Sequence, residues 1–151
     1  MLRVGENMKY YYPTIFYPAE NGAFIGVVPD LQGCITQGDD LTQAMYRIHD
    51  AIGTWLDDPT VREIPSPSKV SEIDASEYPN AIINVVEFDT EKWAATLNPI
   101  RRAQIAAGLS LKELSELLGA PYRTIQDWVY GTHKPPAWIA KLVVEKIQST
   151  I

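Results

Sequence analysis

The sequence has little of the chemistry on which most metal and disulfide sites depend. In 151 residues it holds one cysteine, Cys34, and two histidines, His49 and His133. A single cysteine excludes a disulfide within the chain and is typical of the reducing cytoplasm, where we expect this protein. Because these three residues do not have the spacing of a zinc site, we expect neither a metal nor another cofactor.

Long hydrophobic runs are also missing. No apolar stretch approaches the ~20 residues that a membrane-spanning helix needs, so we expect no membrane partner. The N-terminal segment MLRVGENMKYYY lacks the continuous apolar core of a signal peptide. Residues 1–7 show no periodic pattern and are predicted to be disordered. The pattern does not distinguish Met1 from Met8 as the start of translation.

Basic residues are scarce in the first two thirds of the chain. Residues 1–98 hold six Lys and Arg against fifteen Asp and Glu, a net charge of −9. Residues 99–151 hold seven against four, a net charge of +3, within the overall −6. This asymmetry predicts a different partner for each part. The acidic part would attract a basic protein, and the basic part suits contacts with nucleic-acid phosphates.

The basic part contains two predicted helices joined by a tight turn, between Gly108 and Gly131. Ser110 and Glu113 have the spacing of a capping box at the start of the first helix. Gly119 favours the left-handed conformation that ends a helix, and Pro121 suits the first turn of the next. The apolar residues at helical spacing are Leu111, Leu114, Leu117 and Leu118 in the first helix, and Ile125, Trp128 and Val129 in the second.

The second helix of this pair leaves polar side chains on its outer face: Tyr122, Arg123, Thr124 and Gln126. Arg and Gln make bidentate contacts with base edges in the major groove. From Ile100 to Pro135 the pattern resembles the XRE/Cro-type helix-turn-helix of phage repressors, although Leu111 replaces a residue that is often polar there. The resemblance implies that residues 98–151 bind operator DNA as a homodimer or higher homo-oligomer. The expected phosphate contacts, with weaker support, are Arg101, Arg102, Thr132 and Lys134.

The acidic part is predicted to form a β-β-β-α-β domain over residues 8–95. Strands are expected at 9–17, 23–28, 34–37 and 81–88, and an amphipathic helix capped by Asp39 or Asp40 is expected to reach residue 56. Residues 59–79, rich in Pro, Ser and charge, are predicted to form a surface loop. Pro13 favours an edge position or a bulge for the first strand. Apolar residues on both faces of 81–88 favour an interior position for the fourth strand.

Three short motifs in this part carry a second resemblance: Pro29-Asp30-Leu31, Gly33-Cys34 and Gly38-Asp39. Over Tyr10 to about Leu56, and again at residues 64–68, the sequence resembles the HicB family of antitoxins. The resemblance implies an α+β domain like a reduced ribonuclease H fold without its active site, followed here by the all-α helix-turn-helix domain. Such domains bind and block HicA, a small basic toxin that cleaves mRNA, and often repress their own operon. The toxin-contacting residues are not identified by the sequence.

Other functions are weighed against this interpretation. A nuclease would need carboxylates that converge on metal ions. The candidates are Asp30, Asp39, Asp40 and Asp50, but the first three have simpler roles in turns and caps, and a lone Cys34 is more typical of a core than of a nucleophile. We therefore expect that this protein is not an enzyme. The main alternative is a solitary helix-turn-helix regulator whose HicB-like domain serves for oligomerisation or interaction, without a toxin.

Two apolar segments have an open role at this stage. The aromatic strand at 9–17 is typical both of a core and of a contact surface, because tyrosine is enriched at interfaces. The last predicted helix, 137–148, carries an apolar stripe that either closes the small core or pairs with another chain. That stripe consists of Trp138, Ile139, Leu142, Val143 and Ile147.

Overall fold

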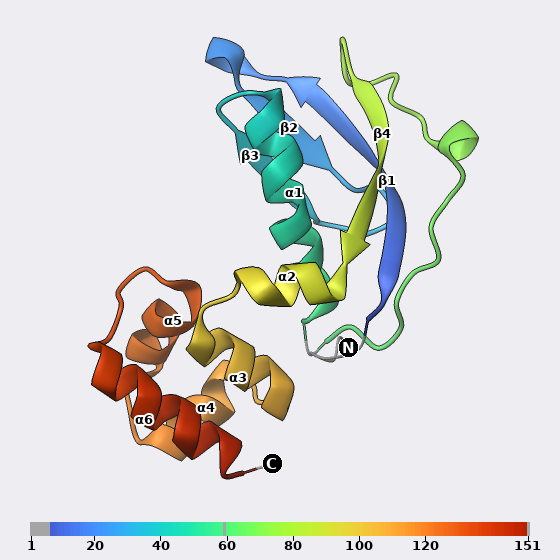
Figure 1. Ribbon diagram of the computed structural model, residues 1–151. Coiled ribbons are helices and arrows are strands. Elements are labelled where there is room, and N and C mark those ends of the chain that lie inside the picture. The colour runs from blue at the N-terminus through green and yellow to red at the C-terminus, as the bar shows by residue number, and fades with distance from the viewer. Residues whose placement is uncertain (1–6, 59, 151) are drawn as a thin grey trace. The chain divides into compact units, whose positions relative to one another are not determined.

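The computed structural model describes residues 7–58 and 60–150 (Figure 1). The chain divides into two compact units, Asn7–Trp93 and the residues from Ala94 onward. The first is α+β and the second is all helical, in agreement with the predicted fold class. The predicted disorder of residues 1–7 falls almost wholly outside the described residues.

The first unit is built on a four-stranded antiparallel sheet in the order β3-β2-β1-β4. Its strands are β1 (Lys9–Pro18), β2 (Phe24–Val27), β3 (Ile35–Gly38) and β4 (Ile82–Asp89). A turn at Glu20–Gly22 joins β1 to β2, with Asn21 and Gly22 both at positive φ, as an Asn-Gly turn favours. β1 pairs with β4 from Lys9–Asp89 to Phe16–Ile82, and with β2 from Ile15 onward.

Two predictions about strand position were wrong. β1 is a central strand and β4 is an outer strand of the sheet. Pro13 is tolerated in β1 because the described pairing with β2 begins only at Ile15, so one side of the strand at Pro13 has no neighbour to receive a ladder bond. The apolar residues of β4 do not all mark buried faces, because Ile82 and Val85 are 46% and 43% exposed.

One helix, α1 (Leu41–Leu56), covers one face of the sheet (Figure 1). Asp40, one of the two predicted caps, accepts the Gln43 N–H at 2.8 Å, and the Gln43 side chain accepts the N–H of Asp39. Its buried residues are Ala44, Ile48, Ile52, Gly53 and Leu56, which lie on one face of the helix as the predicted amphipathic pattern requires. At Gly38 a Cβ would collide with the backbone of Ala44, so only glycine allows α1 to follow β3 so closely.

The segment between α1 and β4 contains one short 3-10 helix, Val70–Glu72, and is otherwise irregular in its described part. Partly buried hydrogen bonds attach it to the rest of the unit. The Tyr12 hydroxyl donates to the Pro65 carbonyl at 2.7 Å, and Asp30 accepts bonds from both the N–H and the hydroxyl of Ser68. These bonds hold residues 65–68 against β1 and against the turn that contains Asp30.

A short helix, α2 (Thr90–Thr96), follows β4 and brings Trp93 against α1. The Trp93 ring lies directly against Gly53 of α1 and is tilted against the Phe88 ring. Its Nε1 donates a hydrogen bond to Asp50 at 3.0 Å. Asp89 accepts the N–H groups of Glu91 and Lys92 and so caps α2. Trp93 thus ties the end of β4 to the middle of α1.

The second unit contains α3 (Pro99–Ala107), α4 (Leu111–Leu118), α5 (Tyr122–Tyr130) and α6 (Ala137–Gln148). Their common core is formed by small and medium apolar side chains: Ile100, Ala103, Leu114, Ile125, Val129, Val143 and Ile147. The stripe predicted on the last helix divides. Val143 and Ile147 are buried in this core, whereas Trp138 and Leu142 are 67% and 56% exposed.

The contact between Gly53 and Trp93 generates a prediction. A Cβ at Gly53 would overlap the Trp93 indole. Alanine improves helix propensity by about 0.5–1 kcal/mol, but overpacking costs about 1–3 kcal/mol. We therefore expect Gly53→Ala to lower the free energy of unfolding by roughly 1–2 kcal/mol in urea titrations. In a Trp93→Leu background the same change should be neutral or stabilising, and an equal loss in both backgrounds would contradict this packing.

Candidate nucleic-acid and partner-binding sites

The turn between α4 and α5 has the local geometry that the sequence predicts. The Ser110 hydroxyl accepts the Glu113 N–H at 3.0 Å, and Glu113 accepts the Ser110 N–H at 3.1 Å, which lowers the pKa of this carboxyl. Gly119 ends α4 at a φ of 64°, and the Ser115 hydroxyl bonds the Ala120 carbonyl at 2.6 Å. These bonds hold the turn and so set where α5 begins.

α5 separates its apolar and polar residues between two faces. Ile125 and Val129 are buried and Trp128 is partly buried. Of the residues predicted to read bases, Tyr122, Arg123 and Gln126 are exposed and Thr124 is partly exposed. The four therefore lie on the outer side of the helix and near its N-terminal end.

Asn98 fixes the other end of α5 to α3. Its side-chain oxygen accepts the Arg101 N–H at 3.0 Å, as a cap of α3. Its amide group donates to the carbonyls of Trp128 and Val129 at 3.2 and 3.0 Å. The cap acts within three residues, whereas the link to α5 joins residues thirty positions apart and has no local signal in the sequence.

The predicted phosphate-contacting residues fall into two groups. Thr132 and Lys134 are exposed just after α5, and the Arg101 guanidinium lies 5.4 Å from the centre of the exposed Tyr130 ring, a cation–π contact. Arg102 differs, because its guanidinium donates to the carbonyls of Ala94, Ala95 and Leu97 at 3.2–3.3 Å. Arg102 therefore braces the end of α2 and the turn that follows.

An acidic residue lies beside the polar face of α5. Asp127, 26% exposed, meets the imidazole Nδ1 of His133 at 3.2 Å. His133 is 77% exposed and belongs to the turn after α5, and its N–H also bonds the Asp127 carbonyl. The pair was not predicted, and it closes the turn that carries Thr132 and Lys134.

In the first unit the carboxylates considered for catalysis have structural partners and do not converge. Asp30 holds Ser68, Asp40 caps α1 and Asp50 accepts from Trp93. Among the described residues, no group of three or more His, Cys, Asp or Glu side chains is placed to hold a metal ion. Cys34 is buried, and burial raises the pKa of its thiol to about 12, so at neutral pH it stays protonated and is not a nucleophile.

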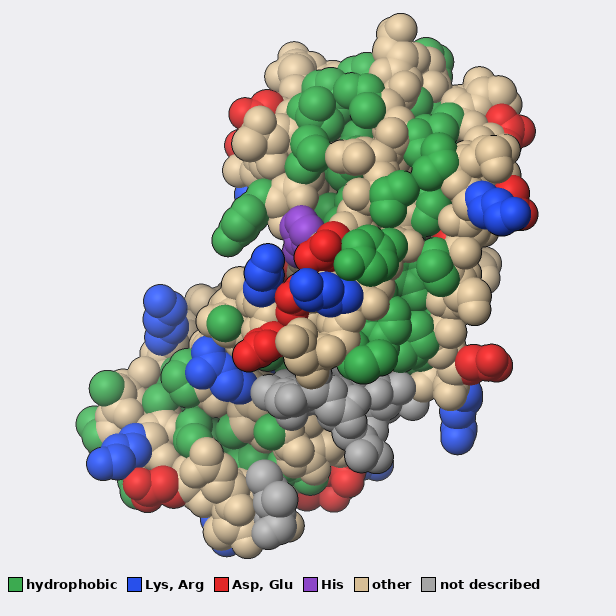
Figure 2. All heavy atoms as spheres, turned by 45° about the vertical axis from the view of Figure 1, so that its right-hand side comes forward, with side chains coloured by type: hydrophobic (Ala, Val, Ile, Leu, Met, Phe, Trp, Pro, Cys, Tyr) green, Lys and Arg blue, Asp and Glu red, His purple; other side chains and the backbone are tan. Residues whose placement is uncertain are grey.

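The aromatic strand has buried side chains on one face and exposed side chains on the other. Tyr12 and Phe16 are buried on the side of the sheet that faces α1. Tyr11 is 48% exposed on the opposite side, where Tyr17 stacks on Tyr78 at 4.5 Å between ring centres. Figure 2 shows hydrophobic side chains gathered in a band across one face of the first unit. Part of the strand is therefore core and part lies on an apolar surface.

Comparisons with known proteins identify the family of this chain. The sequence profile of the HicB-like antitoxin of bacterial toxin-antitoxin systems matches residues 12–108. The chain therefore belongs to this family, which consists of antitoxins and not of enzymes. The match includes the sheet, α1, α2 and α3, whereas α4, α5 and α6 lie beyond it.

The chain is also similar in sequence to two further proteins and in fold to one solved chain. A UPF0150 protein of Synechocystis is 31% identical over 62 residues, which are 41% of this chain and 85% of that protein. An uncharacterised 14.9 kDa protein of Haemophilus phage HP1 is 33% identical over 84 residues, 52% of this chain and 60% of that protein. A solved chain from a toxin–antitoxin complex of Streptococcus pneumoniae is 19% identical with a TM-score of 0.52, over 83% of this chain and all of that chain.

Within residues 7–58 and 60–150, no helix is long and apolar enough to cross a bilayer.

Proposed function

We propose that this chain is a cytoplasmic antitoxin that neutralises a small basic, HicA-like, mRNA-cleaving toxin and represses its own operon by binding operator DNA. The first unit would cover the toxin, and the second would bind DNA. Both steps are stoichiometric binding without turnover. The observation that carries the proposal is the joining, in one chain, of an acidic HicB-like unit to a basic helical unit with an exposed polar helix.

Charge supports a basic partner for the first unit. Residues 7–93 hold five Lys and Arg against fourteen Asp and Glu, a net charge of −9. A surface of this sign steers a basic protein toward it and repels nucleic acid. Because the first unit repels nucleic acid, we assign toxin binding to the first unit and the DNA contacts to the second.

The geometry of α5 supports base reading by the second unit. Arg123 and Gln126 are exposed near the start of a helix whose other face is buried by Ile125 and Val129. A recognition helix enters the major groove in this way, with its N-terminal residues at the base edges. Tyr122 and Thr124 would assist, while Thr132, Lys134 and Arg101 would contact phosphates. Arg102 has a weaker claim, because three carbonyls already use its guanidinium.

A palindromic operator requires two copies of the second unit with recognition helices about 34–36 Å apart. We propose that α6 pairs with α6 of a second copy. Trp138 and Leu142 lie one helical turn apart and are 67% and 56% exposed, so they form one apolar strip that the core does not use. In a twofold contact the same strip meets itself, and both copies then bury it.

A second candidate function is a solitary DNA-binding regulator whose HicB-like unit serves for oligomerisation or other interactions, without a toxin. The exposed apolar side chains Tyr11 and Val85 on the sheet favour a protein contact of some kind in either case. The two functions differ in whether a small basic protein binds.

The direct test of the toxin is co-purification. The small basic protein encoded in the neighbouring reading frame is made by cell-free synthesis together with this chain carrying an affinity tag. We expect a stable complex and loss of mRNA cleavage in the same reaction. Full cleavage in the presence of excess chain would exclude the antitoxin function and favour the solitary regulator.

Base reading is tested by Arg123→Ala. We expect operator affinity to fall by roughly 1–3 kcal/mol, with relaxed specificity at the contacted base pair. The measurement is a mobility shift with duplexes from the promoter of the chain's own gene. Lys146→Ala removes the same charge from α6 and is the control, for which we expect a small loss that is uniform across sequences. Equal behaviour of the two variants would contradict the assignment of Arg123.

The α6 contact is tested by Trp138→Glu, which places a charge in the proposed apolar strip. We expect the variant to sediment as a monomer at concentrations where the unaltered chain is a dimer or larger. Gln148→Glu adds the same charge at another exposed position of α6 and should leave the mass unchanged. A Trp138→Glu chain that keeps the unaltered mass would place the oligomer contact elsewhere.

A further inference from the structure

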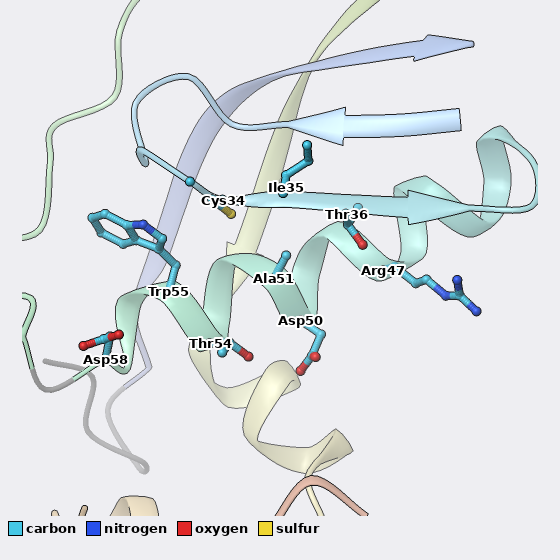
Figure 3. Close-up of a pocket in the computed structure, with 10 residues that line it drawn as sticks. Cys34, Ile35, Thr36, Arg47, Asp50, Ala51, Thr54, Trp55 and Asp58 are labelled. Atoms are coloured by element: carbon cyan, nitrogen blue, oxygen red, sulfur yellow. The ribbon is translucent and has the colours of Figure 1, made fainter. Parts of the chain in front are cut away.

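A groove of about 610 Å³ runs along the outer side of the first unit, between β3 and α1 (Figure 3). Residues 33–36 form its strand wall. Its helix wall is one face of α1, from Arg47 through Ala51 and Thr54 to Trp55, with Asp58 just beyond the helix end. The groove thus lies between β3 and one face of α1, which runs back alongside the strand in the opposite chain direction (Figure 3).

The strand wall offers backbone groups to the groove. β3 is the outermost strand, and it pairs with β2 along one edge only. The Gln37 carbonyl accepts a bond from Arg47 Nη1 at 3.0 Å, which shows that this carbonyl points away from β2. Backbone groups alternate between the two edges of an antiparallel strand, so Ile35, two residues earlier, presents its N–H and carbonyl to the same outer edge.

Charge along the groove is uneven. Asp50 and Asp58 lie on the helix wall, and bonds from the Thr60 hydroxyl and N–H lower the pKa of Asp58, which is therefore ionised at neutral pH. Asp50 accepts a bond from Trp93 Nε1 at 3.0 Å. Arg47 stands at the opposite end, where it already occupies the Gln37 carbonyl. The groove therefore carries two carboxylates along its helix wall and one guanidinium beside the Gln37 carbonyl.

We propose that an extended, Lys- or Arg-bearing segment of the toxin adds to the sheet along the outer edge of β3 and fills this groove. The proposal rests on the proposed function, and the acidic charge of the unit matches a basic occupant. Alternate side chains of an added strand point to opposite faces. One set would lie against Ala51 and Thr54, between the two carboxylates. The other set would lie beside Ile35, whose side chain is 56% exposed on the far face of β3.

Two features of the fold suit this mode of binding. Strand addition supplies affinity through backbone hydrogen bonds and specificity through pockets for alternate side chains. Here the outer edge of Ile35 supplies the bonds and the helix wall supplies the pocket. Arg47 limits the addition to a short stretch, because its guanidinium covers the next outward-pointing carbonyl. The same arrangement protects the free edge from pairing with unrelated strands.

The first test fills the groove. Thr54→Arg places a long cation between Asp50 and Asp58, whereas Thr42→Arg makes the same change at an exposed position in the first turn of α1, outside the groove. The probe is the cell-free-synthesised basic protein encoded beside this chain, and calorimetry gives the Kd. We expect Thr54→Arg to bind at least about tenfold more weakly than the unaltered chain, because like charges then face each other. Thr42→Arg should bind as the unaltered chain does.

The second test addresses the backbone bonds. Proline at position 35 removes an N–H that points to the outer edge, so pairing with β2 is kept while strand addition is blocked. We expect Ile35→Pro to lose the toxin and Ile35→Ala, which keeps the N–H, to lose much less. In the complex with the unaltered chain, the Ile35 N–H should gain protection from hydrogen exchange.

The outcomes separate the two levels of inference. If the unaltered chain does not bind the basic protein, the proposed function fails and the groove proposal fails with it. If the unaltered chain binds and Thr54→Arg binds equally well, the groove is not the site, and the antitoxin function stands. If Thr54→Arg weakens binding but the Ile35 N–H gains no protection, the strand-addition mode is wrong.

Discussion

The pairing of β1 with β4 is the contact on which the first unit depends. It joins residues 66 to 80 positions apart in an unbroken register from Lys9–Asp89 to Phe16–Ile82. This pairing makes β1 the central strand and places β4 where α2 can follow it directly. α2 then brings Trp93 onto Gly53 of α1. It also leaves β3 as the outer strand at the other side of the sheet, with one edge open beside α1. The groove along β3 is therefore a consequence of how the chain closes its sheet.

Local structure was predictable because its signals are local. The Ser110–Glu113 box, Gly119, Gly108 and Asn98 each act within a few residues, and the helices of the second unit begin and end where those residues indicate. Strand order was not predictable in this way. Pro13 suggests an edge, and it does lack a neighbour on one side, but the strand around it lies in the centre of the sheet. Long-range pairing decides such positions, and a single sequence does not encode it in neighbouring residues.

The candidate sites divide along the same line. The outer face of α5 follows from helical spacing, so Arg123 and Gln126 were identified and are exposed. Arg102 looks like its neighbour Arg101 in sequence, yet it serves three carbonyls, because the end of α2 returns to it. The β3–α1 groove had no sequence signal, since its walls come from two elements whose proximity only the fold establishes. Its polar lining, Thr54 and Asp58, reads in sequence as an ordinary solvated helix end.

Two units of opposite charge, each with its own partner, are the central idea of this account. It is tested most directly by the amide spectrum of the isotope-labelled chain, recorded with the basic protein and then with operator duplex. The account predicts that the protein shifts resonances of β3 and α1 alone in its first titration. The duplex should then shift those of α5 and the turn after it. Resonances of α5 that move with the protein, or resonances of α1 that move with the duplex, would contradict it.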